Sequence, residues 1–255
     1  MNSRHSLYWL CVVILFSACK GKTPTTTLFS SMPAEQTGIH FENKIEDTDT
    51  LSILDYLYYY NGGGVAVGDF DNNGLPDIYF TSNQGSNKLY LNKGNFQFED
   101  ITDKAGVQGK GNWKTGVTIA DVNGDGLLDI YVSEIGGYKN FHGRNELFIN
   151  NGISTSGEGG ARVTFSERAH QYGLDVQGFN TQASFFDYDH DGDLDMFLVN
   201  HSVHSNSSYS DSSMRSVKDE ASGDKLFRND PAATGRKFVE VTTAAGIYSS
   251  IIGYG

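Results

Sequence analysis

The sequence is poor in cysteine, in proline and in basic residues relative to acidic ones. Its 255 residues include two cysteines and four prolines, so a framework of several disulfide bonds is excluded by count. Lys and Arg number 19 against 31 Asp and Glu, which gives a net charge of −12. Because a net acidic chain repels phosphate backbones, this balance argues against a protein that binds nucleic acid.

Glycine and aromatic residues are abundant instead. The chain has 30 Gly, 16 Phe and 14 Tyr, and its hydrophobic content of 38% argues against wholesale disorder. A chain of this length buries a real core and has room for one or two domains. The wealth of Gly, Asp, Asn and Tyr favours many short strands joined by tight turns over long helices.

The N-terminus carries the features of a targeting segment. A short basic stretch at Arg4 and His5 precedes ten apolar or aromatic residues, 7–16, which are too few to span a membrane. Phe16-Ser-Ala-Cys19 resembles the lipobox of a bacterial lipoprotein signal peptide, with Phe16 in place of the usual leucine. The resemblance implies that residues 1–19 are removed up to Cys19, which is acylated. An ordinary signal peptide with a chance cysteine is the alternative.

Residues 20–35, rich in Lys, Thr and Ser, are predicted to form a flexible tether. Lys20 follows the cysteine, where an Asp retains lipoproteins at the inner membrane of well-studied bacteria. By this resemblance we expect an outer-membrane lipoprotein, on the periplasmic or surface side, held at the membrane through its lipid anchor only. Residues 36–255 are then left to form the folded domain.

Three copies of one unit make up that domain. A nine-residue motif, D-x-[DN]-x-[DN]-G-x-x-D, begins at Asp69, Asp121 and Asp187. Short apolar runs flank each motif, and each unit ends with a phenylalanine eight residues before a glycine. The units, at about residues 60–107, 115–174 and 181–247, therefore each hold four short strands. Repeated four-stranded sheets predict an all-β protein, a β-propeller of four-stranded blades.

The ends and the insertions of this pattern carry further predictions. Leu28-Phe29 and Gly38-Ile39 resemble the closing strand of a unit that has no unit before it, so a displaced N-terminal strand is expected there. Gly246 predicts a fourth motif near position 260, so we expect a truncated fourth unit and a partial propeller of about three blades. Residues 133–144 and 201–223 are insertions between second and third strands, and are expected to be exposed loops.

The repeated motif has the chemistry of a calcium loop. Oxygen-bearing side chains at positions 1, 3, 5 and 9, the backbone carbonyl of position 7 and a glycine at position 6 suit a hard cation. Zinc and copper are disfavoured, because no His or Cys occupies a ligand position. About three Ca²⁺ sites are predicted. Their candidate ligands are Asp69, Asp71, Asn73, Leu75 and Asp77; Asp121, Asn123, Asp125, Leu127 and Asp129; and Asp187, Asp189, Asp191, Asp193 and Asp195.

The motif has two other interpretations, an EF-hand-like calcium loop and a simple turn. An EF-hand needs a glutamate at position 12 and flanking helices, but position 12 is Phe80, Val132 or Leu198 inside a β-like run, and a dockerin fails likewise. The acidic residues could instead be turn formers only, although five Asp in residues 187–195 would repel one another without a cation. The pattern resembles the FG-GAP and VCBS repeats of integrin-α-type propellers, over roughly residues 60–255.

Other candidate sites are weaker. His201 and His204 could form a metal pair or lie in a solvated loop, and the tyrosines of residues 56–60 could form a sugar platform or pack the first blade. Neither a nucleophile elbow nor a phosphate loop is present in the sequence. A carboxylate pair for glycoside hydrolysis is not excluded.

The sequence thus predicts a non-enzymatic, calcium-binding lipoprotein of the cell envelope. We expect a binding or adhesion module, or a scaffold, whose ligand is an unidentified protein or glycan. The alternative is the non-catalytic part of a larger polysaccharide-processing enzyme or a glycan-binding protein. The segment around residues 58–64 also resembles proteins that pair such repeats with a C-terminal ASPIC/UnbV-type domain, which would lie beyond residue 255.

Overall fold

The computed structural model describes residues 28–154, 162–203, 218–230 and 238–247. The chain divides into two compact units, Met1–Pro33 and Ala34–Gly255, and the fold described below is that of the second. In the first unit only residues 28–33 are described. Leu28 and Phe29 are exposed there and lie in no strand, so the predicted displaced N-terminal strand is not formed.

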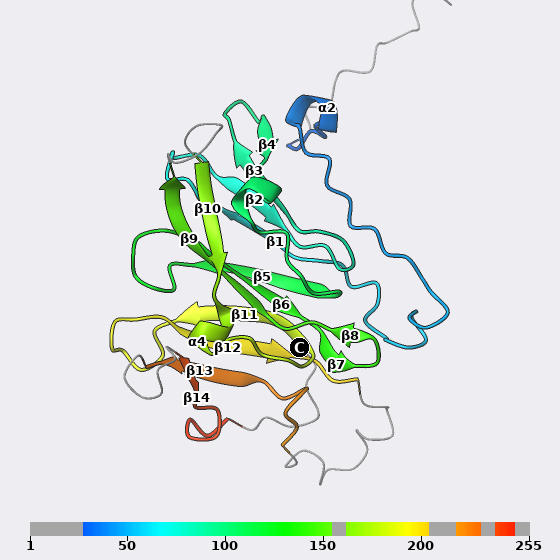
Figure 1. Cartoon of the computed structure of the whole chain (residues 1–255), viewed down its shortest axis with the longest axis vertical. Coiled ribbons are helices and arrows are strands. Elements are labelled where there is room, and N and C mark those ends of the chain that lie inside the picture. The colour runs from blue at the N-terminus through cyan, green and yellow to red at the C-terminus, as the bar shows by residue number, and fades with distance from the viewer. Residues whose placement is uncertain (1–27, 155–161, 204–217, 231–237, 248–255) are drawn as a thin grey trace, which may run out of the picture. The chain divides into compact units, whose positions relative to one another are not determined.

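The second unit contains three four-stranded antiparallel sheets, which confirms the all-β class and the predicted blades of a partial propeller (Figure 1). Blade 1 consists of β1 (Val65–Gly68), β2 (Asp77–Phe80), β3 (Lys88–Asn92) and β4 (Phe98–Asp100). Blade 2 consists of β5 (Lys114–Ala120), β6 (Asp129–Glu134), β9 (Glu146–Ser154) and β10 (Arg162–Glu167). Blade 3 consists of β11 (Asn180–Phe186), β12 (Asp195–Asn200), β13 (Lys225–Asn229) and β14 (Phe238–Glu240).

The blades pack face to face, with the first strand of blade 2, β5, in contact with both β1 and β11. Strand β6 shows how this packing follows from the sequence. Its side chains alternate between the two faces of the sheet, so Ile130 and Val132 join the core shared with blade 1, and Tyr131 joins the core shared with blade 3. Blade 2 is therefore buried on both faces. Blade 1 has an outer face, where Val65 and Val67 are 58% and 57% exposed.

A single helical turn follows the last strand of a blade. The turns are α3 (Thr102–Ala105) and α4 (Ala169–Tyr172), and each ends at a glycine in the left-handed conformation, Gly106 or Gly173. This geometry explains the glycine that recurs eight residues after a phenylalanine, because the left-handed region is open to glycine without a steric penalty. The same turn occurs before blade 1, at α2 (Ala34–Thr37), which is followed by Gly38 at φ +77°.

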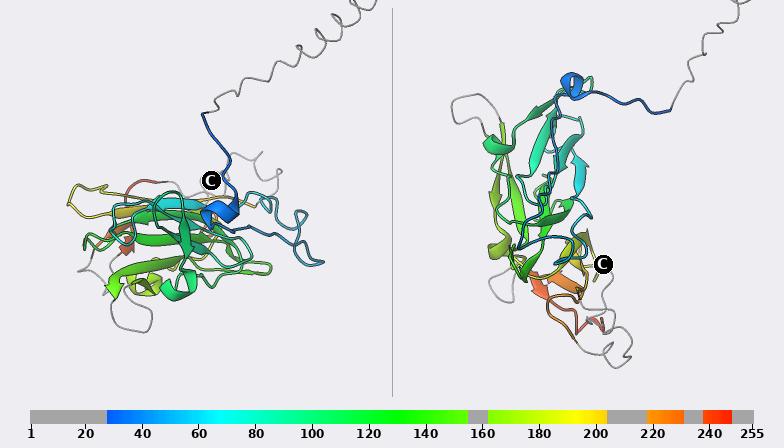
Figure 2. Two further views of the ribbon diagram at one scale, coloured as in Figure 1. Left: turned by 90° about the horizontal axis from the view of Figure 1, so that it is seen from above. Right: turned by 90° about the vertical axis from the view of Figure 1, so that its right-hand side faces the viewer.

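The insertion at residues 133–144 is not the exposed loop that the sequence predicts. It forms a small hairpin, β7 (Gly136–Tyr138) and β8 (Phe141–His142), in which the side chain of Phe141 is completely buried. That ring packs in an aromatic cluster with Tyr56, Tyr59 and Trp113. The segment between α2 and β1 supplies the two tyrosines as it runs along the side of the blades toward β7 and β8 (Figures 1 and 2). The insertion is buried because it contains apolar side chains, such as those of Ile135 and Phe141, that join this cluster.

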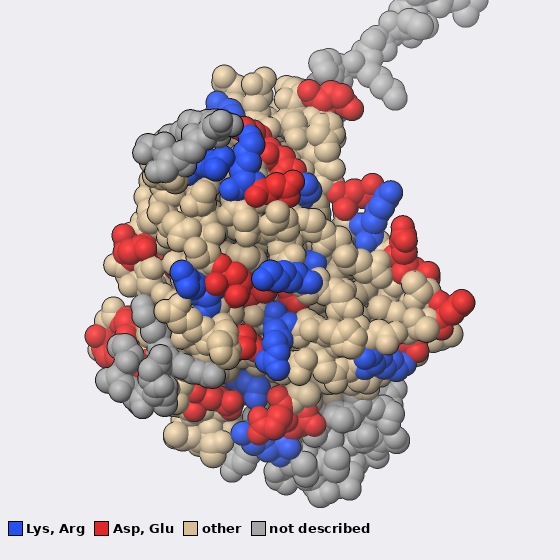
Figure 3. Space-filling model, in the orientation of Figure 1, with Lys and Arg blue, Asp and Glu red and all other residues tan. Residues whose placement is uncertain are grey.

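Charged residues of both signs are mixed on the face drawn in Figure 3. Lys and Arg lie next to Asp and Glu across all three blades, and no large patch of one sign is visible on this face. The ion pairs of the described residues are mostly exposed, as for Lys93 with Glu99 at 3.1 Å. Pairs of this kind contribute little to stability, because water screens them.

Candidate metal centres

Each Asp motif forms the bend between the first two strands of a blade. We call the bends loop 1 (residues 69–77), loop 2 (residues 121–129) and loop 3 (residues 187–195). In all three, the residue before position 1 pairs across the hairpin with the aspartate at position 9. The three loops therefore follow the same ends of β1, β5 and β11, as the repeat predicts. The pairs are Gly68 with Asp77, Ala120 with Asp129 and Phe186 with Asp195.

The aspartate at position 1 holds the bend closed. In loop 1, the carboxylate of Asp69 accepts hydrogen bonds from the amides of Asn73 and Gly74, at 3.0 and 2.8 Å. The equivalent bonds in loops 2 and 3 span the same positions, at 2.8–3.2 Å. Three independent sequences thus adopt one bend, and the acceptors are Asp69, Asp121 and Asp187.

Glycine at position 6 is required by the backbone rather than by space. Gly74, Gly126 and Gly192 have φ of +85°, +85° and +96°, and a Cβ atom at any of them would meet nothing within 4 Å. Position 4 is also left-handed, but there loop 1 has Asn72 and loop 3 has His190. The glycine of the motif is therefore selected for a sharp turn, as the sequence predicts.

The aspartate at position 9 is fully buried and joins three parts of a blade. In loop 1, Asp77 accepts hydrogen bonds from the amide of Phe70 inside the loop and from the amide of Asn92 at the end of β3, both at 2.8 Å. Burial raises its pKa to about 6, although the hydrogen bonds from these two amides lower it. Loops 2 and 3 repeat the arrangement through Asp129 with Val122 and Asn150, and through Asp195 with Tyr188 and Asn229.

Two of the loops bring three carboxylates to one point. In each, one ligand oxygen per aspartate lies within 4.8 Å of the other two. In loop 1, Oδ1 of Asp71 is buried and has no hydrogen-bond partner among the described residues, although a buried carboxylate oxygen without a partner is costly. An oxygen-only donor set around an unpartnered anion fits a hard divalent cation. The two sets are Asp69, Asp71 and Asp77, and Asp187, Asp189 and Asp195.

Loop 2 differs, because position 3 is an asparagine. Its side-chain amide donates to Oδ2 of Asp125 at 2.9 Å, and its Oδ1 accepts from the backbone amide of Asp125 at 3.0 Å. Asn123 therefore hydrogen-bonds the neighbouring carboxylate. Among the described residues, loop 2 has no group of three converging carboxylates like those of loops 1 and 3. The repeated motif predicts three equal loops, whereas the geometry separates loop 2 from the other two.

Positions 5 and 7 are linked to each other. In every loop the side-chain oxygen at position 5 accepts a hydrogen bond from the amide at position 7, at 2.8–3.1 Å. The predicted role of the position 7 carbonyl, at Leu75, Leu127 and Asp193, stays a prediction. The side chain of Asp193 adds a further acidic group in loop 3, where its Oδ1 is buried without a partner. The residues at position 5 are Asn73, Asp125 and Asp191.

Comparison with known proteins agrees with this geometry. Residues 69–132 match the family model described as an FG-GAP-like repeat. This stretch contains loops 1 and 2 with the strands between them. The chain is also similar to cartilage acidic protein 1 of Xenopus tropicalis, at 33% identity over 142 residues, and to the human and mouse proteins of that name, at 31% over 149 residues. The matched part covers 56–58% of this chain and about a fifth of the length of those relatives.

The site includes a set of asparagines for which the sequence predicts no role. Asn92 and Asn229 end β3 and β13, and Asn150 lies inside β9. Their backbone amides donate to the aspartates at position 9 of the same blade. The side chain of Asn150 also donates to the carbonyl oxygen of Phe70 at 2.9 Å, which connects blade 2 to loop 1. The signal was available, because an asparagine recurs at this register in all three units.

The two weaker sequence candidates have a structural role. Tyr56 and Tyr59 are buried, which supports the packing interpretation for them. His201 is 5% exposed, so the solvated-loop interpretation is wrong at this position, and its ring nitrogens meet the hydroxyls of Tyr56 and Thr181 at 2.8 and 3.1 Å. His204 lies outside the described residues.

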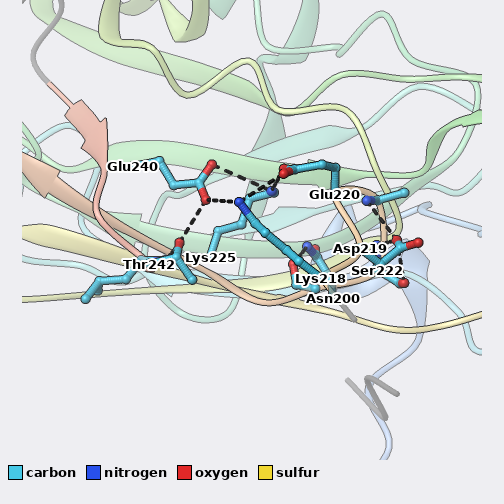
Figure 4. Close-up of polar contacts among 11 residues, drawn as sticks. Asn200, Lys218, Asp219, Glu220, Ser222, Lys225, Glu240 and Thr242 are labelled. Atoms are coloured by element: carbon cyan, nitrogen blue, oxygen red, sulfur yellow. Dashed lines mark hydrogen bonds and ion pairs between the residues drawn. The ribbon is translucent and has the colours of Figure 1, made fainter. Parts of the chain in front are cut away.

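A further group of charges lies at the start of each third strand. In blade 3, the ammonium of Lys225 is buried between the carboxylates of Glu220 and Glu240, at 3.1 and 3.6 Å (Figure 4). Blade 2 has Glu146 at the equivalent position, and Glu134 and Lys114 are buried next to it. Burial and Glu146 raise the pKa of Glu134 to about 9, so this carboxyl group holds a proton at neutral pH.

The N-terminal signal is not part of the structure described. Cys19 and residues 1–27 lie outside the described residues, so lipidation and the tether at residues 20–35 stay predictions. Within the described segments, no helix combines the length and the apolar character needed to cross a membrane.

Proposed function

We propose that the chain is a calcium-stabilised propeller module of a cell-envelope lipoprotein, with a role in binding or adhesion. The observation that carries the calcium part is the convergence of three carboxylates in loops 1 and 3, with Asp71 Oδ1 buried and unpartnered. Such oxygens lose their solvation in the fold, and a divalent cation would restore the lost interaction. The FG-GAP-like match supports a binding or adhesion-type module.

The residues that would hold the ion are those at positions 1, 3 and 9, together with position 5 and the carbonyl of position 7. A bound cation would supply charge neutralisation, which allows the loop to close and the blade hairpin to keep its register. Extracellular calcium modules bind at about 10⁻⁴–10⁻³ M, and tenfold saturation of one site contributes about 1.4 kcal/mol. This magnitude favours a structural ion over a signalling ion.

Thermal unfolding of the purified chain in EDTA and in millimolar CaCl₂ tests the calcium part. At about 2–4 °C per kcal/mol for a domain of this size, we expect a rise of about 3–6 °C in Tm for each occupied site. Asp71→Ala and Asp189→Ala should each lose part of the rise. Both change position 3, whose side chain is not used by the bonds that close the bend.

The matched control is Asp49→Ala, which removes an exposed aspartate outside the loops. It should keep the full calcium response. Equal Tm values in EDTA and in calcium, or an equal loss of response in Asp49→Ala, would contradict the proposal. Magnesium at the same concentration should give a smaller shift, because it demands a tighter octahedral geometry.

The envelope location rests on Cys19, and it is tested separately. Full-length protein should partition with membranes, and Cys19→Ser should release it into the soluble fraction without changing the calcium response. Retention of the serine variant in the membrane fraction would contradict lipid anchoring. Reading the gene beyond residue 255 tests the proposed ASPIC/UnbV-type neighbour.

A further inference from the structure

A cavity of about 290 Å³ lies at the ends of the inner strands opposite to the calcium loops. It is placed where β5 and β11 begin, next to the start of β1, so blades 2 and 3 and the segment before β1 contribute to its wall. The proposed function gives this cavity no role. The residues that define it are the glycines before β1 (Gly62, Gly63 and Gly64), Thr115 of β5, Gln182 of β11, and the aromatic group described next.

Aromatic rings form one side of the cavity and are fixed by packing. The rings of Tyr56 and Trp113 meet edge to face at 6.0 Å, and the rings of Tyr58 and His201 lie 4.4 Å apart. Both ring nitrogens of His201 have hydrogen-bond partners, so its plane cannot turn freely. Tyr58 is half-buried, whereas Tyr56 and Trp113 are almost fully buried. The wall is thus preorganised and needs no folding step to accept a flat apolar surface.

The opposite side of the cavity offers backbone and amide groups. No hydrogen bond from the backbone amides of Gly62 and Gly63 to another described residue is formed. A Cβ atom at Gly63 would come within 2.2 Å of the carbonyl oxygen of Thr81, so only glycine allows the chain to pass here. Asn61 is exposed beside them. These groups can donate and accept hydrogen bonds in fixed directions.

Among the described residues that line the cavity, none is an Asp, Glu, Lys or Arg, and the imidazole of His201 is the one basic group. Burial lowers the pKa of His201 to about 4, so this ring is neutral at neutral pH. An ion that entered would lose its solvation without gaining an opposite charge, which disfavours charged ligands. The volume lies at the lower edge of the range for small-molecule sites, about 300–1,000 Å³, so the occupant has a single ring or is of similar size.

We infer that this cavity binds one neutral sugar ring, either a free monosaccharide or the terminal residue of a glycan. The apolar face of a pyranose stacks on an aromatic ring, and its hydroxyls match the glycine amides and Asn61. The inference rests on the proposed role as a binding module and names the chemistry of its ligand. It does not depend on the calcium loops, which lie at the other ends of the strands.

Tryptophan fluorescence reports on the cavity directly. The chain has two tryptophans, and Trp9→Phe leaves Trp113, in the cavity wall, as the sole emitter. The full chain with this change is titrated in millimolar calcium with methyl glycosides of glucose, galactose, mannose, N-acetylglucosamine, fucose and rhamnose. We expect a saturable change in emission with at least one of them. Glycans coupled through their reducing ends to a surface distinguish a terminal sugar from a free monosaccharide.

Two variants and a matched control decide the result. Tyr58→Ala should weaken binding at least tenfold, and Asn61→Asp should weaken it by placing a charge at the entrance. Tyr60→Ala removes a neighbouring tyrosine that is 58% exposed and does not line the cavity, so it should leave binding unchanged. The Tm of each variant shows whether it is folded, and Asn61→Asp, an exposed change, serves if Tyr58→Ala is unstable.

The inference is overturned if no neutral glycoside gives saturable binding, or if Tyr60→Ala weakens binding as much as the cavity variants. Stronger binding of glucuronate or sialic acid than of neutral sugars would also overturn it. A calcium-dependent rise in Tm without sugar binding would leave the proposed function standing and remove only this site. Sugar binding without a calcium-dependent rise in Tm would support this site and contradict the calcium part of the proposed function.

Discussion

Strand β6 carries a fully buried carboxyl group at each end, and the two ends are stabilised in different ways. At its start, Asp129 accepts hydrogen bonds from the amides of Val122 and Asn150, at 3.0 and 2.8 Å. At its end, neither oxygen of Glu134 has a partner in the described part of the chain that meets hydrogen-bond geometry. Burial raises the pKa of Asp129 to about 6 and that of Glu134 to about 9.

The difference shows what a buried carboxylate needs. Backbone amides replace the lost water at Asp129, so the charge is tolerated and the group joins two strands and a loop. At Glu134, burial and the second acid, Glu146, outweigh the backbone amide of Gly111 and the charge of Lys114, which both favour the ionised form, so this carboxyl group keeps its proton. The first arrangement occurs in all three blades and the second only in blade 2 among the described residues.

The largest effect is expected when Asp129, whose carboxylate accepts hydrogen bonds from two backbone amides, is replaced. Asp129→Ala leaves two buried amides without acceptors and opens a small cavity, so we expect the free energy of unfolding to fall by about 3–5 kcal/mol. Urea denaturation in EDTA measures this change without a contribution from a cation. Asp125→Ala, in the exposed part of the same loop, is the matched control and should cost less than about 1 kcal/mol in EDTA. Similar losses in the two variants would show that the amides of Asp129 are not important to the fold.

Much of the amide-bonded end could be predicted from the sequence. The motif repeats three times at constant register, so Asp129 and its equivalents were assigned to a hairpin bend, and the glycine at position 6 to a sharp turn. The carboxylates that converge in loops 1 and 3 are among the ligands predicted there, and their role as ligands stays a prediction. The inequality of loop 2 did not, because an asparagine and an aspartate both offer an oxygen at position 3, and only the folded loop shows where the amide nitrogen donates.

The other end of β6 could not be predicted. Nothing in the local pattern shows that Glu134 and Glu146 meet, because their proximity depends on the pairing of β6 with β9 across an insertion of variable length. The same insertion was expected to be exposed, yet its apolar residues pack against the segment before β1, which is distant in the sequence. Periodicity predicts the blades, whereas contacts between insertions require the tertiary structure.

An effect of intermediate size is expected when Glu134, the carboxyl group that keeps its proton, is replaced by glutamine. The folded protein holds the proton of Glu134 to about pH 9, whereas the unfolded chain loses it near the ordinary value of 4.5. Between these values the folded state binds more protons, so stability falls as pH rises, by at most about 1.4 kcal/mol per pH unit. Glu134→Gln removes this dependence, and it should be more stable than the parent at pH 9 by at least about 1 kcal/mol, relative to their difference at pH 6.

Urea denaturation at pH 6, 7.5 and 9 in saturating calcium measures the effect of Glu134→Gln. If the loops bind calcium as proposed, the loop aspartates stay in one state, and the groups that face Glu134 are Glu146 and Lys114. Glu42→Gln, an exposed change, is the control and should follow the parent at every pH. Parallel curves for the parent and Glu134→Gln would mean that Glu134 is ionised in the folded state.

The smallest effect concerns the bend that brings Asp129 to its amides. Gly126 at position 6 has φ +85° and Gly124 at position 4 has φ +74°, and a Cβ atom on either would meet nothing within 4 Å. Any cost is therefore backbone strain alone. Gly126→Ala should lower the free energy of unfolding by about 1 kcal/mol, since a non-glycine residue is strained in the left-handed region. Gly124→Asn should cost less, because loop 1 already has Asn72 at that position with φ +53°. Equal losses in the two variants would show that position 6 has no stricter requirement for glycine than position 4.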